Sequence, residues 1–505
     1  MLAQHTNIMV SNNGLPEEPS MAINPINPLQ MVVGANITKY CYSNDGGYNW
    51  NEGELSSSFG VWGDPTIVVD TNGSFYFFHL SGNYTDSNWL DRIVCQKSVN
   101  GGQTWSDGTF LGNFSPKQQD KQWSVVDPKT NAIYITWTQF DKYDSHVHTD
   151  SSNILFSKST DGGLNWSVAK RINQFAGDCL DGDSTVEGAF PAVGPNGELY
   201  VSWAGPAGIR FDRSLDGGDT WLENDILIND MPGGWDMAIP GLNRSNGLPV
   251  INCDRSNSVN KGTIYVNWAD QRNGSFDTDI WLSKSTDGGN TWSVAKRVND
   301  DPAGKQQFLS WMTIDQLNGN LYFVFYDRRN EVGNNNSTEV YMAVSKDGGE
   351  HFLNFKISES PFIPNPNIFF GDYNNIVAHN NIIRPIWTRL ENDSISIWTA
   401  IIDTVFLGID NLPEVNAPFS LDQNYPNPFK MSTSFAFKFR NPSIASLKIY
   451  DVFGKVVDIL FENKHFDAGK YIENFDVASH NLEAGVYYFS LQNKAGVKVR
   501  KLIIE

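Results

Sequence analysis

The chain has 505 residues, which is enough for more than one domain with a sizeable core. It holds 37 Lys and Arg against 57 Asp and Glu, and the resulting net charge of −20 argues against nucleic acid or an anionic membrane as its partner. No apolar run is long enough for a transmembrane helix. Aromatic residues make up 13% of the chain and Gly occurs 43 times, a composition that favours many short strands joined by tight turns.

The first residues and the number of cysteines give information on the cellular compartment of the protein. Met1-Leu2-Ala3-Gln4 resembles the small-residue end of a signal peptide whose apolar core has been trimmed. Four cysteines are too few for a disulfide scaffold. We expect Cys41 and Cys95, which lie on predicted strands, to be buried thiols, whereas the sequence leaves open whether Cys179 and Cys253 form a disulfide.

One eight-residue pattern recurs six times along the chain. Its form is Ser-x-Asp-x-Gly-x-x-aromatic, and its copies are SNDGGYNW, SVNGGQTW, STDGGLNW, SLDGGDTW, STDGGNTW and SKDGGEHF. The acid positions, from Asp45 to Asp347, are 55 to 71 residues apart, as in a repeat array. Within each copy the short acid can accept hydrogen bonds across a turn, a Gly can take a positive φ and the aromatic residue can pack under its strand. Each copy is therefore predicted to be a hairpin corner.

The segments between these corners read as short β-strands. Three β-rich runs precede each corner and one follows it, as in PTIVVD, SFYFFHL and RIVCQKS ahead of the second copy. Four antiparallel strands per repeat is the blade of a propeller. The pattern resembles the Asp-box, or BNR repeat, of the sialidase-like β-propellers, in which the box marks the fold and lies on the rim away from the catalytic mouth.

A seventh set of strands follows the sixth box without a box of its own. It consists of DYNNIVAH, IIRPIWTRL and SISIWTAIID, and it lacks a fourth strand. Residues His5 to Asn13 resemble the outermost strands of other repeats, so we predict that they supply it and close the ring. The sequence thus predicts an all-β, seven-bladed propeller over residues 1–410, with the six blades of true sialidases as the alternative.

A Pro-containing segment, residues 411–417, is the predicted linker to a small C-terminal β-sandwich, residues 418–505. NYPNPF, YDVFGK, LEAGVYYFSL and the basic terminus resemble the type A C-terminal sorting domain of the type IX secretion system of Bacteroidetes. That resemblance implies a partner, the secretion machinery, and a secreted or outer-membrane-surface location.

Chemistry in a propeller is expected at the axial mouth, where the innermost strands begin. Carboxylates precede most of these strands, and crowded like charges would raise some of their pKa values. The residues just before the innermost strands are Glu17, Glu18, Asp64, Asp120, Lys121, Glu187, Asp236, Arg244, Gln306, Gln307, Asp372 and Tyr373. Of these, Asp120, Asp236, Arg244 and Asp372 are candidate substrate-binding residues, although the acids could equally cap turns.

The sialidase resemblance implies roles for three of these positions. It implies Asp64 in GDPTIVVD as the acid, Glu187 in EGAFPAVG as the residue paired with the nucleophile, and Tyr373 in GDYNN as that nucleophile. The chain departs from the family in lacking an Arg-Ile-Pro motif and an evident arginine trio. Besides Arg244, the candidates for such a trio are Arg255, Arg328 and Arg384.

Metal and cofactor signals are weak. Asp178, Asp181 and Asp183 lie in a Gly-containing loop whose oxygens could bind a structural calcium ion, although the loop is not an EF-hand. His146 and His148 are too few for a zinc site, and no other cofactor motif is present.

Two functions remain open on the sequence. The first is a secreted propeller that binds a glycan or glycoprotein and hydrolyses glycosides in a sialidase-like way, through Asp64, Glu187 and Tyr373 or through paired carboxylates alone. The second is a non-catalytic adhesion or protein-interaction module.

Overall fold

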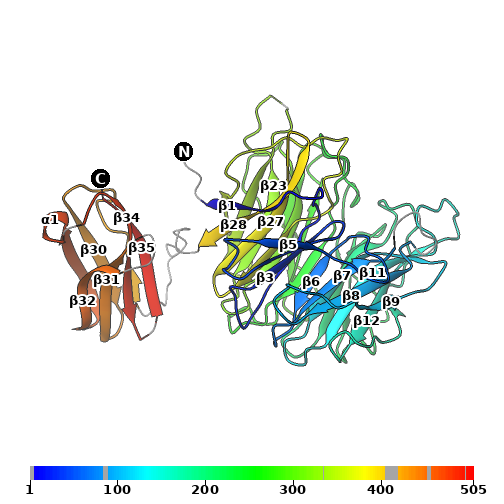
Figure 1. Cartoon of the computed structure of the whole chain (residues 1–505), viewed down its shortest axis with the longest axis horizontal. Helices are drawn as coiled ribbons and strands as arrows, with labels where there is room; N and C mark the ends of the chain where they lie inside the picture. Colours follow the sequence, from blue (N-terminus) through cyan, green and yellow to red (C-terminus); the bar gives the residue numbers. More distant parts are fainter. Residues whose placement is uncertain are drawn as a thin grey trace. The chain divides into compact units, whose positions relative to one another are not determined.

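The computed structural model describes residues 5–82, 89–333, 335–403, 419–451, 456–480, 482–494 and 496–504. The chain divides into two compact units, Met1–Ile402 and Asp403–Glu505 (Figure 1). Over the described ranges the secondary structure is strand apart from one short helix, α1 (Val477–His480). The predicted linker, residues 411–417, lies outside the described residues.

The larger unit contains seven four-stranded antiparallel sheets. The first three, from innermost to outermost strand, are β2 (Ser20–Ile23), β3 (Met31–Ala35), β4 (Lys39–Ser43) and β5 (Asn51–Glu54); β6 (Thr66–Val69), β7 (Phe75–Leu80), β8 (Arg92–Ser98) and β9 (Thr109–Gly112); and β10 (Gln118–Val126), β11 (Ile133–Phe140), β12 (Ser152–Ser159) and β13 (Lys170–Arg171). The next three are β14 (Glu187–Val193), β15 (Leu199–Ala204), β16 (Ile209–Ser214) and β17 (Ile226–Asn229); β18 (Val250–Cys253), β19 (Ile264–Asp270), β20 (Asp279–Ser285) and β21 (Lys296–Arg297); and β22 (Gln307–Ile314), β23 (Leu321–Asp327), β24 (Glu339–Ser345) and β25 (Leu353–Lys356).

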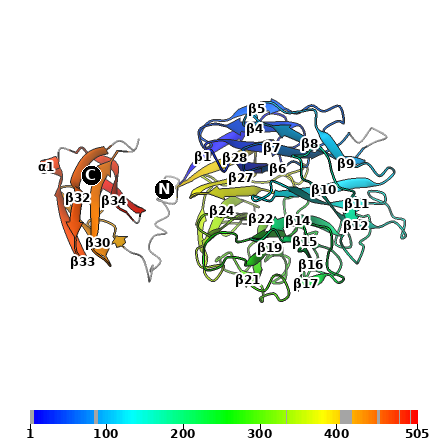
Figure 2. The same cartoon turned by 90° about the horizontal axis from the view of Figure 1, so that it is seen from below.

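The seventh sheet joins the two ends of this unit. It contains β26 (Asn375–His379), β27 (Ile382–Glu391), β28 (Ser394–Asp403) and, outermost, β1 (Thr6–Ser11). Thr6 pairs with Ile401 and Met9 with Trp398, so the predicted pairing of the N-terminal segment with the last strand is present (Figures 1 and 2).

The innermost strands contact one another in sequence order, and β26 returns to contact β2. In Figure 2 the innermost strands β10, β14 and β22 lie toward the middle of the unit, and the outermost strands β5, β9, β17 and β21 lie at its edge. Buried apolar clusters fill the spaces between neighbouring sheets, such as the one that joins Phe156 of β12 to Val201 and Trp203 of β15. The arrangement is propeller-like, as predicted. We call the end where the innermost strands begin the mouth and the opposite end the base.

The six boxes are hairpin corners between the third and fourth strands of their sheets, and therefore lie at the base. In the first box, Ser43 Oγ donates to Asp45 Oδ1 (2.8 Å), and the backbone N–H groups of Gly47 and Asn49 donate to Ser43 Oγ and Asp45 Oδ1 (2.9 and 3.0 Å). Both glycines of this box have positive φ, +81° for Gly46 and +93° for Gly47, where only one was expected to need it.

The boxes also join neighbouring sheets. Lys158, which directly precedes the third box, donates to the carbonyl oxygen of Gly217 in the fourth box (2.8 Å). Lys284 makes the same bond to Gly348 in the sixth box (2.8 Å), and Arg384 of the seventh sheet donates to Gly46 in the first box (2.8 Å). Val344 occupies the equivalent position before the sheet that has no box. The repeated motif thus fixes each sheet against the one before it.

The C-terminal unit has two antiparallel sheets around one apolar core. One contains β29 (Phe419–Leu421), β30 (Ser432–Phe439) and β33 (Gly469–Asp476); the other contains β31 (Ser443–Tyr450), β32 (Val456–Phe466), β34 (Gly485–Asn493) and β35 (Gly496–Ile504). Both contribute side chains to a core that includes Phe435, Phe475, Leu447 and Phe489. Because residues of alternating polarity line these strands, the unit buries a core of its own.

Candidate active site at the mouth

The backbone at the mouth is held in an unusual conformation. Four residues that precede an innermost strand or lie near its start have a positive φ between 47° and 54°. They are Glu18, Asp64, Lys121 and Leu309. A left-handed conformation is unfavourable for residues with a side chain, and such residues gather at functional sites. Backbone strain at the mouth therefore coincides with charged side chains at Glu18, Asp64 and Lys121.

Lys121 is the centre of the charged cluster. Its buried ammonium lies 2.7 Å from Asp372 Oδ2, 3.3 Å from Asp64 Oδ2 and 3.9 Å from Glu18 Oε1. Burial opposes the charge, but the surrounding carboxylates outweigh it and raise the pKa of Lys121 well above its ordinary value. Lys121 is thus a permanent cation within a ring of acids.

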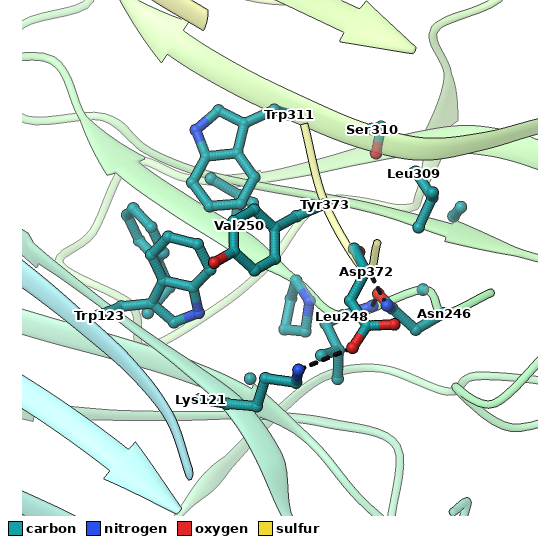
Figure 3. A pocket seen from close by; sticks show the side chains of 15 residues that line it. Lys121, Trp123, Asn246, Leu248, Val250, Leu309, Ser310, Trp311, Asp372 and Tyr373 are labelled. Carbon is teal, nitrogen blue, oxygen red and sulfur yellow. Dashed lines mark hydrogen bonds and ion pairs between the residues drawn. The ribbon is translucent and has the colours of Figure 1, made fainter. Parts of the chain in front are cut away.

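Asp372 also pairs with a second cation, Arg244, which lies in the loop before β18. Arg244 Nε donates to Asp372 Oδ1 (2.7 Å), and Arg244 Nη2 forms an ion pair with Oδ2. Asn246 Nδ2 also donates to the backbone oxygen of Asp372 (2.9 Å), as Figure 3 shows. Burial would raise the pKa of Asp372, but Lys121 and Arg244 outweigh it and lower the pKa to about 2. Asp372 is therefore ionised at any physiological pH.

Asn36, on the loop after β3, ties the first sheet to the second. Its Nδ2 donates to Glu18 Oε2 (2.6 Å), and its Oδ1 accepts the backbone N–H of Asp64 (2.7 Å). Glu18 Oε1 accepts the backbone N–H of Asp372 (3.0 Å). Burial raises the pKa of the neighbouring Glu17 to about 8, and burial together with Asp64 raises that of Glu18 as well.

Glu187, at the start of β14, is a buried acid whose carboxyl group has no hydrogen-bond donor beside it in the described ranges. Its side chain is fully buried, and within the described residues no N–H or O–H group donates to either of its carboxyl oxygens. Burial raises its pKa well above the ordinary value, and Asp181 and Asp120 raise it further. Burial and the neighbouring acids thus favour the protonated form of Glu187.

Asp181 links this acid to the cation pair. Its Oδ2 accepts a hydrogen bond from Tyr143 Oη (2.6 Å) and contacts Arg244 Nη1 (3.3 Å). One small pocket is lined by Lys121, Asp181, Glu187, Trp235, Asp236, Arg244 and Asp372 together with three neighbouring residues. The acid with a raised pKa and the acid with a lowered pKa therefore line the same pocket.

Below the charged cluster, an aromatic cluster fills the axis. The ring of Trp123 lies 4.7 Å from that of Trp311, 4.8 Å from that of Tyr373 and 5.4 Å from that of Phe190, measured between centroids. Figure 3 shows the three labelled rings facing one another. Tyr373 Oη donates to the backbone oxygen of Pro65 (3.3 Å), and burial together with Glu18 and Asp64 raises its pKa well above 10.

The structure brings together the seven predicted catalytic and substrate-binding residues. Asp64, Glu187, Asp236, Arg244 and Asp372 lie in or against the charged cluster, and Asp120 is buried beside Lys121. Tyr373 lies in the aromatic cluster beneath them, and no hydrogen bond joins it to Glu187 in the described part of the chain. The tyrosine–glutamate pair of a sialidase is thus not assembled here.

The arginine candidates do not converge. Arg328 is fully buried and donates to Thr338 and Gln306. Arg384 bonds the first box, and Arg255 lines a cavity at the base. Among the described residues, Arg244 and Lys121 are the basic groups that line the mouth pocket, and both already contact carboxylates.

The three acids of the predicted calcium loop contact different groups. Asp178 Oδ1 accepts from Thr185 Oγ1 (2.9 Å), Asp183 Oδ1 accepts the backbone N–H of Asp236 (2.8 Å), and Asp181 joins the mouth cluster. No group of three or more possible ligands is arranged for a metal in the described ranges. The four cysteines are buried free thiols, so the disulfide left open for Cys179 and Cys253 is absent.

Several residues of the mouth were not predicted from the sequence. Asn36 and Tyr143 lie in loops away from the starts of the innermost strands. Trp235 and Asn246 lie beside the predicted residues Asp236 and Arg244 but carry no charge that marks them. Asp181 was predicted as a metal ligand rather than a mouth acid, because its sequence neighbours Asp178 and Asp183 are also acidic. Its positive φ of 51° resembles that of the strand-start residues and is visible only in the structure.

Comparison with known proteins gives the family context. Residues 423–505 match the family model described as a secretion system C-terminal sorting domain. A sialidase from Bacteroides fragilis (strain YCH46) is 25% identical over 309 residues, which are 54% of this chain and 51% of that protein. The chain thus spans about half the length of this curated relative.

Solved structures are similar at lower identity. An ulvan lyase of polysaccharide lyase family PL25 aligns with a TM-score of 0.47 and 13% identity over 78% of this chain and 95% of the other. The NanB sialidase of Streptococcus pneumoniae aligns with a TM-score of 0.45 and 11% identity over 74% and 83%.

Location follows from the C-terminal match. Among the described residues, no helix has the length and apolar character needed to span a membrane. The chain carries a secretion system C-terminal sorting domain at residues 423–505, is similar to a sialidase over about half of its length, and is secreted or held at the outer-membrane surface.

Proposed function

We propose that the seven sheets are the blades of one closed seven-bladed propeller, and that the two C-terminal sheets form a β-sandwich attached through residues 411–417. The cyclic contacts of the innermost strands and the pairing of β1 with β28 support the closed ring. The single apolar core between the C-terminal sheets supports the sandwich.

The protein is a secreted glycan-active propeller that binds a saccharide at the mouth and cleaves a glycosidic bond there. The observation that carries this function is the pair of opposite pKa shifts in one pocket. Burial, Asp181 and Asp120 keep Glu187 protonated, while Lys121 and Arg244 keep Asp372 ionised. Two carboxyl groups held in opposite protonation states are the arrangement that glycoside hydrolysis requires.

The roles follow from the protonation states. Glu187 donates its proton to the glycosidic oxygen as the bond from that oxygen to the anomeric carbon breaks. The ionised carboxylate of Asp372 stabilises the positive charge that develops on the sugar ring. Water then adds to the anomeric carbon and returns a proton to Glu187.

The charges at the mouth favour a neutral glycoside over a sialoside. A sialic acid carboxylate needs cations that are free to bind it, and Lys121 and Arg244 are already paired with Asp372. Tyr373 is also engaged in the aromatic cluster with a raised pKa, which makes it a weak nucleophile. The mechanism therefore uses paired carboxylates rather than a tyrosine.

A second function, a non-catalytic glycan- or protein-binding module, is favoured by one observation. The Glu187 side chain is fully buried, and the aromatic cluster fills the axis beneath it, so the mouth is shallow. Arg244, whose side chain is 39% exposed, lines the same pocket as Glu187.

A glycosidase panel separates the two functions. The full-length chain is incubated with fluorogenic neutral hexosides, amino-hexosides and a sialoside, and the same chain is applied to a glycan array. We expect turnover of a neutral glycoside that falls at least a hundredfold in Glu187→Gln and in Asp372→Asn, and that persists in the matched surface control Glu198→Gln. Array binding without turnover supports the binding module, and preferred turnover of the sialoside contradicts the substrate class.

A further inference from the structure

A second cavity lies at the base, on the opposite side of the aromatic cluster from the mouth. It has a volume of about 270 Å³ and is open to solvent, and residues of all seven innermost strands line it. Its lining combines aliphatic residues, among them Ile23, Val69, Val126 and Val193, with polar groups in about equal share. Phe190 lines both this cavity and the pocket under the mouth, so the aromatic cluster separates the two. We call this cavity the basal channel.

Arg255 is the charged residue in the lining of the basal channel. It follows β18, and its backbone N–H donates to Gln316 Oε1 (2.8 Å), while Gln316 Nε2 donates to the backbone oxygen of Cys253 (3.0 Å). Gln316 thereby fixes the backbone from which the arginine side chain extends.

The guanidinium of Arg255 has no partner within the described residues. It forms no ion pair, and none of its side-chain nitrogens donates a hydrogen bond there. Burial lowers the pKa of Arg255, as expected for a cation without a counter-ion. After burial, the buried thiol of Cys253 and then Asp127 act on Arg255, and the Asp127 oxygens already accept hydrogen bonds from the backbone N–H of Lys129 (2.9 Å) and from Thr130 Oγ1 (2.7 Å).

We propose that the basal channel binds an organic monoanion with an apolar body, whose carboxylate or sulfonate pairs with Arg255. Small-molecule sites are cavities of roughly 300–1,000 Å³ with mostly apolar walls and a few polar groups that set the orientation. The basal channel is close to the lower end of this range, and its lining combines aliphatic residues with one cation. The planar guanidinium can donate two parallel hydrogen bonds to a carboxylate, which places the apolar body along the aliphatic walls.

Other occupants fit the basal channel less well. An uncharged molecule would leave the guanidinium unpaired, and a cation would meet its positive charge. The site is independent of the proposed glycoside cleavage, because the aromatic cluster lies between Arg255 and the residues of the mouth.

Calorimetric titration of the full-length chain with octanoate and with octanamide tests the proposal. The two molecules share an apolar body and differ in charge. We expect octanoate to bind more tightly than octanamide, and Arg255→Gln to weaken octanoate binding at least tenfold while leaving octanamide unchanged. Arg255→Lys should retain part of the affinity, and Lys261→Gln, which removes an exposed cation from the same hairpin, should retain all of it.

A second variant tests the location. Ala378 lines the basal channel from β26, and Ala378→Trp fills it with an indole ring. Octanoate binding should then be lost while the melting temperature stays within a few degrees of that of the parent. Unchanged octanoate binding in either Arg255→Gln or Ala378→Trp, or equal affinity for octanoate and octanamide, overturns the proposal. Glu187→Gln should bind octanoate as the parent does, so failure here is distinguishable from failure at the mouth.

Discussion

Arg244 and Asp372 are 128 residues apart in the chain, and the structure joins them through two hydrogen bonds, one of them from Arg244 Nε to Oδ1 at 2.7 Å. Asp372 also forms an ion pair with Lys121 of β10 at 2.7 Å, so residues from three separate parts of the ring form one ion cluster.

Replacing Arg244 by Gln should destabilise the protein and raise the pKa of Asp372 from about 2. A carboxylate with a lowered pKa in the folded state stabilises that state above its ordinary pKa near 4, and this contribution is lost as the pH falls from 4 toward 2. Because the Arg244 side chain is 39% exposed, we expect a loss of only about 1 kcal/mol at pH 7.

Urea unfolding at pH 7 and at pH 3 measures this effect. The difference in free energy of unfolding between parent and variant should shrink at pH 3. Arg171→Gln, which removes an exposed cation from β13, is the matched control and should change little. An equal loss at both pH values would contradict the assignment of the shift to Arg244.

Glu187→Gln should stabilise the protein at neutral pH. The pKa of Glu187 is raised in the folded state, so the folded protein holds a proton that the unfolded chain releases above pH 4.5. Stability is therefore lost as the pH rises above 4.5, and the amide avoids this loss because it carries no proton to release. We expect a melting temperature about 2–4 °C above that of the parent at pH 7, roughly 1 kcal/mol, and no difference at pH 4.

Thermal unfolding followed by circular dichroism from pH 4 to pH 8 measures the difference. A variant that is less stable than the parent at every pH would mean that Glu187 is ionised and stabilised by a partner.

The fourth box offers a matched pair of glycine substitutions. Gly217 and Gly218 both have positive φ, +72° and +86°, so Ala is strained at either position by about 1 kcal/mol. A Cβ at Gly217 would have its nearest neighbour at 3.7 Å, whereas a Cβ at Gly218 would lie 2.2 Å from Phe156 of the preceding sheet. We therefore expect Gly218→Ala to cost about 1–3 kcal/mol more than Gly217→Ala.

Chemical denaturation of both variants gives the comparison directly. Equal losses would mean that the box is a local turn and does not join neighbouring sheets.

Deleting residues 5–11 together with the residues before them removes β1. The edge of β28 then loses its partner strand, and exposed strand edges pair with other chains. We expect a melting temperature lower by at least 5 °C and aggregation at micromolar concentration. Size-exclusion chromatography with light scattering measures the second effect, and a monomer of unchanged stability would contradict closure by β1.

The sequence alone determined the strands, the six corners, the seventh sheet and its N-terminal partner. It did so because each repeat carries its own local signals, such as alternating apolar residues and the Ser-x-Asp-x-Gly corner of Ser43 to Trp50. It also located the acids of the mouth, since Asp64, Glu187 and Asp372 directly precede or begin innermost strands that must converge.

Only the tertiary structure decided which of these charges meet. Lys121 and Arg244 reach Asp372 from other sheets, while Arg255, Arg328 and Arg384 lie elsewhere, and no local pattern distinguishes the two groups. Asp181 joins the mouth and Asp178 does not, although they lie three residues apart. The reason is physical: strand pairing depends on neighbours in sequence, whereas the pKa of a buried carboxyl depends on charges within a few ångströms that the ring of sheets brings together.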